Sequence, residues 1–306
     1  MAALGLCMGG ASVSVVTVVK DPDESQLLAT MHSVASQTHD DVRYVLVDGG
    51  TTGIGACVAG QLWPMTEFVL ISEPDRGIYD AMNKAVAQAS GDLLLFLNAG
   101  DTLVPHALQR LVSHATEIRD EAIIYCDYWF GTTAASAPKR LNCAFDLYNM
   151  GVAHQALIIP RDLFRRLGPY RTDFRIVSDH LWMREARDRG VPFAHLSERL
   201  VCIDDRGLSS GASPNDLACF EAETAARVTM RYDFVTDELA RKLFRYRKDP
   251  SVRPSIDDQG RSPIQRGCFG PFIGTAGRPG VGLHRQVCPE SRPFAMELSG
   301  DSRRRS

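Results

Sequence analysis

Hydrophobic and polar positions in the first hundred residues follow two alternating periods. Continuous apolar runs occur at Val13–Val19, Tyr44–Val47, Phe68–Ser72 and Leu93–Leu97. Such runs are typical of strands that are buried on both faces of a parallel sheet. The segments between them place apolar residues three or four positions apart, which predicts helices. Strands that alternate with helices at this spacing predict right-handed βαβ units and a mainly parallel sheet flanked by helices.

Three helices are predicted between these strands. The stretch "DPDE" marks the start of the first helix, with Asp21 as its expected N-cap. A weaker helix is expected at about residues 56–62. The third helix has the clearest pattern and Gly91 as its stop signal, and its apolar face consists of Ile78, Ala81, Met82, Ala85, Val86 and Ala89.

From about residue 120 the pattern becomes mixed. We expect strands at residues 122–129, 156–160 and 199–203, and helices at 161–168, 178–190 and 215–231. Ser178 is the expected N-cap of the second of these helices. Beyond Pro250 the chain is rich in Gly, Pro, Arg and Ser without periodicity, which predicts a disordered tail.

The composition narrows the class of protein. A chain of 306 residues can form one large α/β domain with an appendage. Its net charge of −3 provides no basic field, so we expect no nucleic-acid partner. The 8 cysteines include no Cys-x-x-Cys pair, which gives a zinc site or a redox pair little support. No secretory signal and no run long enough to span a bilayer is present, so we expect a cytoplasmic protein.

A basic and aromatic segment, "RKLFRYRK" at residues 241–248, precedes the tail. Such a segment could contact an anionic membrane surface, which would make the protein peripheral at the inner face of the membrane. A solvated terminal helix explains the same pattern equally well.

Acidic residues follow the ends of the predicted parallel strands. They are Asp21, Asp48, Glu73 with Asp75, and Asp101. Each one alone is most simply a turn residue or a helix cap. Together they would meet at one edge of the sheet, where open α/β sheets bind their ligands. An acidic edge that binds a nucleotide diphosphate needs a bridging cation such as Mg²⁺.

Other nucleotide-binding motifs fit less well. The chain has no phosphate-binding loop of the type G-x-x-x-x-G-K-[ST], and no glycine fingerprint follows the first strand. The stretch "GGTTGIG" at residues 49–55 resembles the cofactor loop of short-chain dehydrogenases. However, it follows the second strand, and no Tyr-x-x-x-Lys occurs downstream. A dehydrogenase is therefore a minor alternative.

Several stretches, taken together, resemble one known family. These are "SVVTVV", "QTHDDVRYVLVDGG", "SEPDRGIYDAMNKAVAQASGDLLLFLNAGD", "HQALIIPRDLFRRLGPY" and "DFRIVSDHLWMREARDRG", in that order. The chain resembles a family 2 glycosyltransferase of the GT-A fold over roughly residues 12–210. The resemblance is strongest to the bacterial branch that builds surface polysaccharides and glycolipids.

The resemblance implies roles for particular residues. Asp101 matches the carboxylate next to the metal, Mg²⁺ or Mn²⁺, and Gly100 stands where many relatives have another acid. Asp48 matches the acid that recognises the base or ribose. Asp179 matches the catalytic base, and His154 matches a residue on the acceptor or diphosphate side. The rest of the nucleotide-sugar pocket would include Thr17, Asp75, Arg76, Asn83, Lys84, Asn98 and Gly100.

The implied activity is inverting transfer of a sugar from a nucleoside-diphosphate sugar, with UDP as the expected nucleotide, to a hydroxyl of a glycan, a glycolipid or a lipid-linked acceptor. A sugar-1-phosphate nucleotidyltransferase is less well supported, because "VVKDPDE" is not a Gly-rich triphosphate loop. Departures from the family pattern, such as "VVKD" and the short "SDHLW", keep a weakly active or silent sugar-nucleotide-binding protein as an alternative.

These expectations divide the chain into five parts. Residues 1–11 would be a flexible N-terminus, 12–120 the nucleotide-sugar-binding half and 121–212 the acceptor and catalytic half. Residues 213–249 would form C-terminal helices, and 250–306 the disordered tail.

Truncation after residue 249 should leave folding and activity nearly intact. The tail has no apolar periodicity and could not offset the entropy lost on ordering. Thermal unfolding of the full and the truncated chain checks this prediction. A large fall in the melting temperature on truncation would contradict it.

Overall fold

The computed structural model describes residues 10–59, 67–118, 121–135, 152–207 and 214–230, and five single residues between 237 and 245. The expected tail, and most of the basic segment 241–248, lie outside the described residues. The chain divides into two compact units, residues 1–268 and 269–306, and all described residues belong to the first.

Four parallel strands form the first part of the sheet, in the order β3-β2-β1-β4. They are β1 (Val13–Val19), β2 (Val42–Asp48), β3 (Glu67–Ser72) and β4 (Leu93–Phe96). Every residue of β1 and β4 is buried, as the unbroken apolar runs predict. Val19 lies beside Asp48 in the register, and Asp48 lies beside Ser72. The carboxyl ends of these strands therefore meet at one edge.

The second part of the sheet is mixed, as predicted. From β4 the order continues β8-β6-β9-β5, and β7 pairs with β6. The strand β8 is antiparallel to both β4 and β6, β6 is parallel to β9, and β9 is antiparallel to the short β5. The bounds of these strands are β5 (Thr102–Leu103), β6 (Ile123–Phe130), β7 (Thr133–Ala135), β8 (Leu157–Pro160) and β9 (Phe193–Ile203).

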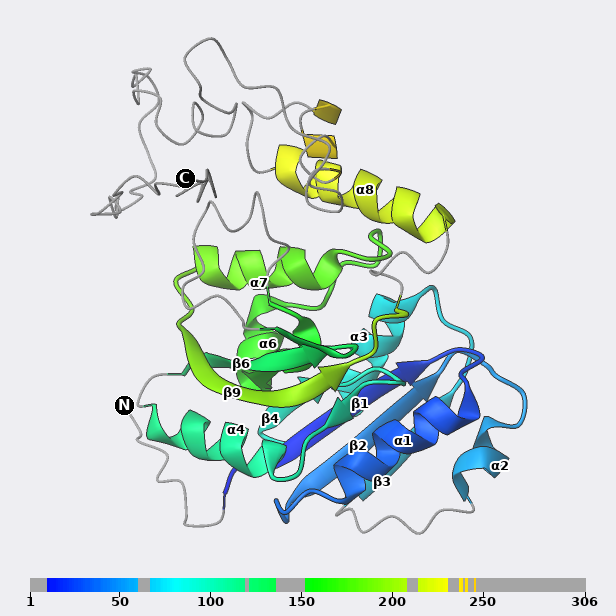
Figure 1. Cartoon of the computed structure of the whole chain (residues 1–306), viewed down its shortest axis with the longest axis vertical. Helices are drawn as coiled ribbons and strands as arrows, with labels where there is room; N and C mark the ends of the chain where they lie inside the picture. The colour runs from blue at the N-terminus through cyan, green and yellow to red at the C-terminus, as the bar shows by residue number, and fades with distance from the viewer. Residues whose placement is uncertain are drawn as a thin grey trace, which may run out of the picture. The chain divides into compact units, whose positions relative to one another are not determined.

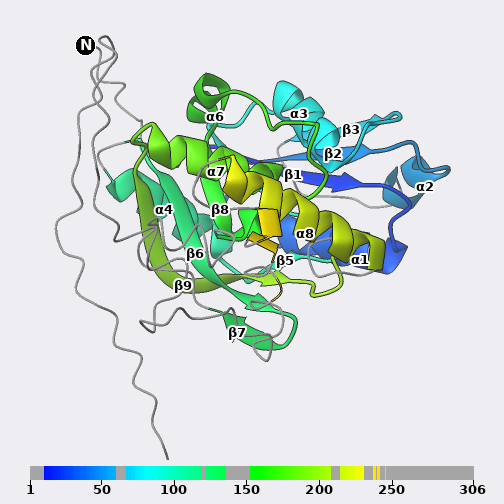
Figure 2. The ribbon, with the colours of Figure 1, turned by 90° about the horizontal axis from the view of Figure 1, so that it is seen from above.

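Helices cover both faces of the sheet. Figures 1 and 2 show α1 and α4 on one face and α3 and α6 on the other, and α7 and α8 follow later in the chain. A short 3₁₀ helix, η1 (His154–Ala156), precedes β8. The helices are α1 (Glu24–Ala35), α2 (Ile54–Ala59), α3 (Ile78–Gln88), α4 (Ala107–Glu117), α6 (Arg161–Leu167), α7 (Ser178–Asp188) and α8 (Pro214–Thr229).

Two expected N-caps are wrong. Asp23, not Asp21, caps α1, because its carboxylate accepts a hydrogen bond from the backbone N–H of Gln26 at 3.1 Å. Asp21 instead adopts a left-handed conformation with φ of 47°. Ser178 is the first residue of α7 and makes no cap, so the turn before this helix is satisfied in another way.

A buried aromatic cluster fixes α6 and α7 against β4. Phe164 stacks on Trp182 with ring centroids 4.8 Å apart, and Tyr170 lies 5.5 Å from Phe96. The indole N–H of Trp182 donates to the carbonyl of Gly168 at 2.9 Å. Large aromatic rings with satisfied polar groups give a rigid core, and this core sets the position from which α7 starts.

Glu223 of α8 satisfies the backbone in front of α7. Its carboxylate accepts hydrogen bonds from three consecutive N–H groups, those of Arg175, Ile176 and Val177, at 2.5, 2.7 and 3.2 Å. Arg175 also forms an ion pair with Asp216 of α8 at 2.7 Å. Glu223 of α8 therefore caps the backbone segment that leads into α7.

Glu223→Gln should lower the free energy of unfolding by about 1–3 kcal/mol, because hydrogen bonds to a charged group are lost from partly buried N–H groups. Urea unfolding measures this change. Glu185→Gln is the matched control, since Glu185 is an exposed helical acid paired with Arg189, and its effect should stay within about 0.5 kcal/mol. Equal effects of the two substitutions would contradict the capping role of Glu223.

Candidate active site

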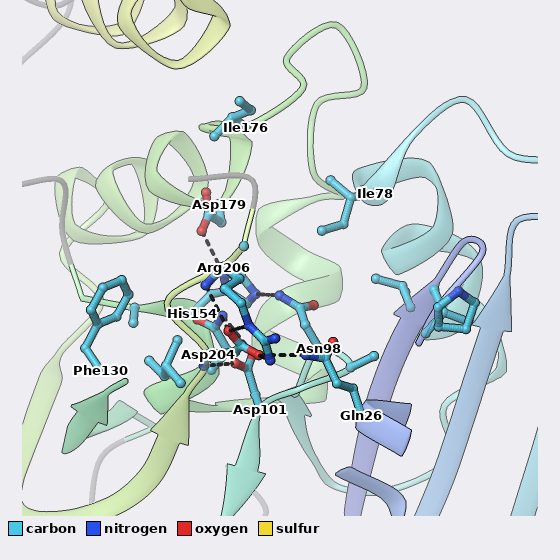
Figure 3. A pocket seen from close by; sticks show the side chains of 18 of the residues that line it. Gln26, Ile78, Asn98, Asp101, Phe130, His154, Ile176, Asp179, Asp204 and Arg206 are labelled. Atoms are coloured by element: carbon cyan, nitrogen blue, oxygen red, sulfur yellow. Dashed lines mark hydrogen bonds and ion pairs between the residues drawn. The ribbon is translucent and has the colours of Figure 1, made fainter. Parts of the chain in front are cut away.

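A cavity of about 840 Å³ lies at the carboxyl edge of β1 and β4. Elements from both parts of the sheet contribute to its wall. These are the end of β1, the turn after β4, the β6–β7 hairpin, η1, the start of α7 and the end of β9. Figure 3 shows Asn98, Asp101, His154, Asp179, Asp204 and Arg206 gathered around one space.

The turn after β4 places Asp101 in this wall. Gly100 has a φ of 96°, a conformation that favours glycine, and the N–H of Asp101 donates to the carbonyl of Asn98 at 3.0 Å. The hydroxyl of Thr30 on α1 accepts from the N–H of Gly100 at 2.9 Å and donates to the carbonyl of Asp101 at 2.8 Å. These hydrogen bonds satisfy polar backbone groups where the chain leaves the buried strand.

The carboxylate of Asp101 is buried and joins two other segments. Its Oδ1 accepts from the backbone N–H of Asp204 at 2.8 Å, and its Oδ2 accepts from the amide of Gln155 at 3.0 Å. Burial raises the pKa of Asp101 to about 6. A buried carboxylate of this kind binds a proton or a cation more readily than an exposed one.

Asp204, at the end of β9, fills the space that Gly100 leaves. A Cβ atom at position 100 would lie 3.0 Å from Asp204 Oδ2, and the left-handed φ would strain any side chain there. The carboxylate of Asp204 accepts from Gln26 at 3.1 Å and forms an ion pair with Arg206 at 2.7 Å. The hydrogen bond from Arg206 lowers the pKa of Asp204.

The donor set suits a hard divalent cation that also binds a diphosphate. Mg²⁺ takes oxygen ligands, commonly one or two carboxylates with substrate phosphates. Asp101 and Asp204 provide two neighbouring carboxylates, and each oxygen of Asp101 keeps a free lone pair. Within the described part of the chain, no group of three or more His, Cys, Asp and Glu residues could hold a metal ion.

A chain of hydrogen bonds links Asp179 to the same turn. Asp179 Oδ2 lies 2.9 Å from His154 Nδ1, and His154 Nε2 lies 3.2 Å from Asn98 Nδ2. Asp179 Oδ1 accepts from Tyr79 at 2.8 Å and from the N–H of His180 at 2.9 Å. Although burial raises the pKa of Asp179, the charges and hydrogen bonds of these neighbours hold it below its usual range.

Asp48 and Asp75 lie beyond the cavity wall, at the ends of β2 and β3. Asp48 is fully buried, and its Oδ2 accepts from the N–H groups of Gly50 and Thr51 and from the hydroxyl of Ser72 at 2.7–3.1 Å. Its Oδ1 has no hydrogen-bond partner. Asp75 is close to the same turn, because a Cβ on Gly49 would lie 2.7 Å from it.

Thr17 and Asn83 have structural contacts and do not line the cavity. The buried Thr17 hydroxyl donates to the carbonyl of Leu97 at 2.7 Å and accepts from Tyr44 at 2.6 Å. The amide of Asn83 bonds both backbone groups of Tyr170, at 2.8 and 2.9 Å. These residues hold β4 and the aromatic cluster in place, and a direct contact with a nucleotide stays a prediction.

Arg76 and Lys84 also point to partners outside the cavity wall. Arg76 pairs with Asp80 at 2.8 Å, and Lys84 pairs with Glu73 at 2.8 Å and donates to the carbonyl of Pro74 at 2.9 Å. They fix the loop between β3 and α3. Their expected role in the nucleotide pocket likewise stays a prediction.

Sequence reasoning missed four contributors to the site. Gln155 and Gln26 hold the two carboxylates, and Tyr79 bonds Asp179. Asp204, at the end of β9, lies beside Asp101. Gln155 stands next to His154 in "HQAL", which was the one local signal for any of the four.

Comparison with known proteins identifies the class that this fold and site define. A family model described as glycosyl transferase family 2 matches residues 14–183. The chain belongs to this family of glycosyltransferases. Membership decides against the dehydrogenase and nucleotidyltransferase alternatives.

Curated relatives agree with this family. A PGL/p-HBAD biosynthesis glycosyltransferase of Mycobacterium bovis (strain BCG / Pasteur 1173P2) is 34% identical over 160 residues, which cover 50% of this chain and 61% of that protein. An uncharacterized glycosyltransferase of Mycobacterium tuberculosis (strain ATCC 25618 / H37Rv) is 30% identical over 192 residues, covering 57% and 68%. The chain thus spans about three fifths of the first relative's length.

Solved structures confirm the expected GT-A fold. The mannosyltransferase PcManGT from Pyrobaculum calidifontis, in complex with GDP-Man and Mn²⁺, has a TM-score of 0.59 at 15% identity and covers 81% of this chain and 77% of its own. S. aureus TarS 1-349, in complex with UDP-GlcNAc, has a TM-score of 0.56 at 15% identity, covering 77% and 72%. In the described residues, no helix has the length and apolar character to cross a bilayer.

Replacing Asp101 with Asn should change how stability depends on pH. The pKa of Asp101 rises from 3.8 to about 6 on folding, so the folded state loses stability as pH rises from about 4 to above 6. Two pKa units correspond to about 3 kcal/mol. Relative to the parent, Asp101→Asn should therefore gain about that much stability between pH 4 and pH 8. Urea unfolding at both pH values measures this, and a difference independent of pH would contradict it.

Proposed function

We propose that this glycosyltransferase moves a sugar, with inversion, from a nucleoside-diphosphate sugar to an acceptor hydroxyl. One observation supports this most directly. The acidic turn at Asp101, which suits a cation and diphosphate, and the Asp179–His154 pair, which suits proton abstraction, line the same cavity. Inverting transfer needs both in one place, because the acceptor loses its proton while the diphosphate leaves.

The donor we propose is a UDP-sugar. Asp48 is the residue that we propose for the base or ribose of either nucleotide, since its buried Oδ1 has no partner and could accept from a base N–H or a ribose hydroxyl. A neighbour in fold is described with UDP-GlcNAc and another with GDP-Man. UDP is our choice because TarS is described with both UDP and UDP-GlcNAc. The particular sugar is a matter for a binding screen.

Mg²⁺ or Mn²⁺ would be held by Asp101, with Asp204 as the neighbouring carboxylate. Such a cation stabilises negative charge on a leaving diphosphate. The protein's own contribution is to keep Asp101 desolvated and oriented by Asp204 N–H and Gln155. Arg206 forms an ion pair with Asp204 and lines the cavity together with Asp101. Its guanidinium would therefore lie close enough to contact a bound diphosphate.

The acceptor we propose is a glycolipid or lipid-linked glycan. Relatives named for PGL/p-HBAD biosynthesis support this class. Tyr128 and Phe130 of the β6–β7 hairpin also line the cavity, and Phe130 is 40% exposed. Aromatic side chains with accessible faces suit the apolar faces of sugars and aglycones.

Donor binding should depend on Asp101 and on the cation. In Asp101→Asn we expect the affinity for UDP-GlcNAc or GDP-Man in the presence of Mn²⁺ to fall at least about 10-fold, since charged metal ligands contribute at least as much as their supporting residues. Parent affinity should also fall below about pH 6, because protonated Asp101 cannot bind a cation.

Titration calorimetry with Mn²⁺ and with EDTA measures these affinities. Asp127→Asn is the matched control, since Asp127 is a buried acid that does not line the cavity. Release of UDP or GDP from the bound donor separates an enzyme from a silent binding protein. Donor binding by Asp101→Asn that still responds fully to Mn²⁺ would rule out this role for the turn.

A further inference from the structure

The carboxylate of Asp179 has little capacity left for a substrate. It is 4% exposed, and its two oxygens already receive hydrogen bonds from Tyr79, from the N–H of His180 and from His154. A carboxylate that is held by three donors is stabilised in its ionised form and is a weak base. Three of the roughly four lone-pair sites of this carboxylate are therefore already used.

His154 shares the cavity wall with this carboxylate. Its ring stands on η1, lines the cavity and is 13% exposed. Asp179 Oδ2 lies 2.9 Å from Nδ1, so in a neutral ring the hydrogen is on Nδ1 and the lone pair is on Nε2. The carboxylate therefore directs the basic nitrogen of His154 away from itself, toward Asn98.

Asn98 marks the place that an acceptor hydroxyl would take. Its amide nitrogen lies 3.2 Å from His154 Nε2, and its Oδ1 is buried without a hydrogen-bond partner. An amide N–H and a hydroxyl are both donors, so a hydroxyl can replace Asn98 at Nε2 at little cost. The orphaned Oδ1 would then be available to a second hydroxyl of the bound sugars.

His180 is the other imidazole near Asp179. Its Nε2 lies 3.9 Å from Asp179 Oδ2, which is beyond hydrogen-bond distance. Asp179 therefore orients His154 and does not orient the ring of His180.

We propose that His154 Nε2, and not Asp179, takes the proton of the acceptor hydroxyl, with Asp179 as the positioning residue that fixes its tautomer. This inference rests on the proposed function.

The acceptor O–H bond breaks and its proton moves to Nε2, while the oxygen forms a bond to the anomeric carbon. The bond from that carbon to the diphosphate oxygen breaks, and its electron pair leaves with the nucleoside diphosphate. The imidazolium then returns its proton to water. Asp179 stabilises the positive ring in between, as carboxylates do in nucleophile–histidine–acid triads.

The first test reads the tautomer and needs no substrate. Long-range ¹H–¹⁵N spectra of the full chain, with His154 assigned through His154→Asn, should show hydrogen on Nδ1 and a bare Nε2 at neutral pH. Asp179→Asn should shift this tautomer ratio. His195 is an internal reference with the opposite expected tautomer, because its Nε2, and not its Nδ1, lies 2.9 Å from a carboxylate, that of Asp127. An Nε2–H tautomer of His154, or a doubly protonated ring at neutral pH, would overturn the inference.

The second test measures turnover with water as the acceptor. Release of UDP from UDP-GlcNAc, or of GDP from GDP-Man, should fall by about 10²–10⁴-fold in His154→Ala and His154→Asn, the usual range for a general base. In His154→Asn the amide can still donate an N–H to Asp179 but has no basic nitrogen. A loss of turnover in this variant is therefore not explained by the loss of the hydrogen bond to Asp179. Donor affinity should change less than about 2-fold in both variants, since the base acts after binding.

Added imidazole should restore turnover in His154→Ala, because it can enter the space of the missing ring. His195→Ala removes the ring of the other Asp–His pair, which lies outside the cavity wall, and should show neither the loss nor the rescue. Absence of rescue in His154→Ala, together with rescue of Asp179→Ala by formate, would make Asp179 the direct base and overturn the inference. Absence of donor turnover in the parent would instead overturn the proposed function itself, together with the inference that rests on it.

Discussion

The site depends on one buried charge, the carboxylate of Asp101. It sits directly after the all-buried strand β4, where an ionised group is costly unless it is hydrogen-bonded. Its partners come from two distant segments, the N–H of Asp204 at the end of β9 and the amide of Gln155 in η1. The need to satisfy this one group ties the mixed part of the sheet to the parallel part. A cation with its bound diphosphate would satisfy the same need.

The same turn also contacts the His154–Asp179 pair on the cavity wall. Asn98 begins the turn and contacts His154, which in turn contacts Asp179 at the start of α7. The aromatic cluster around Phe164 and Trp182 fixes the helix, and Glu223 fixes the backbone before it. The buried carboxylate of Asp101 and the His154–Asp179 pair are thus both connected to residues 98–101.

This arrangement explains two departures from the family pattern, at Gly100 and at Asp21. Gly100 lacks a carboxylate, and the space that a side chain would need is taken by Asp204. The glycine is therefore compensated by an acid from another strand. Asp21 in "VVKD" has a left-handed backbone whose N–H is held by the hydroxyl of Thr51 at 2.8 Å. That strained residue lines the cavity, so the altered strand end forms part of the cavity wall.

Local sequence determined the parallel strands, the amphipathic helix α3 and the family, because unbroken apolar runs and period-3.6 faces need no distant partner to be recognised. The prediction from local sequence missed α4, although Leu108, Leu111 and Val112 share a helical face. It also made β9 too short, since half-exposed positions weaken an apolar run. It named Asp101, Asp179 and His154 through the motif resemblance. Only the tertiary structure showed that these residues form hydrogen bonds with one another and with Asp204, Gln155 and Tyr79. The hydrogen-bonded residues are 25 to 103 positions apart in the sequence. The partners of each buried polar group are therefore fixed only when the elements at the sheet edge pack together.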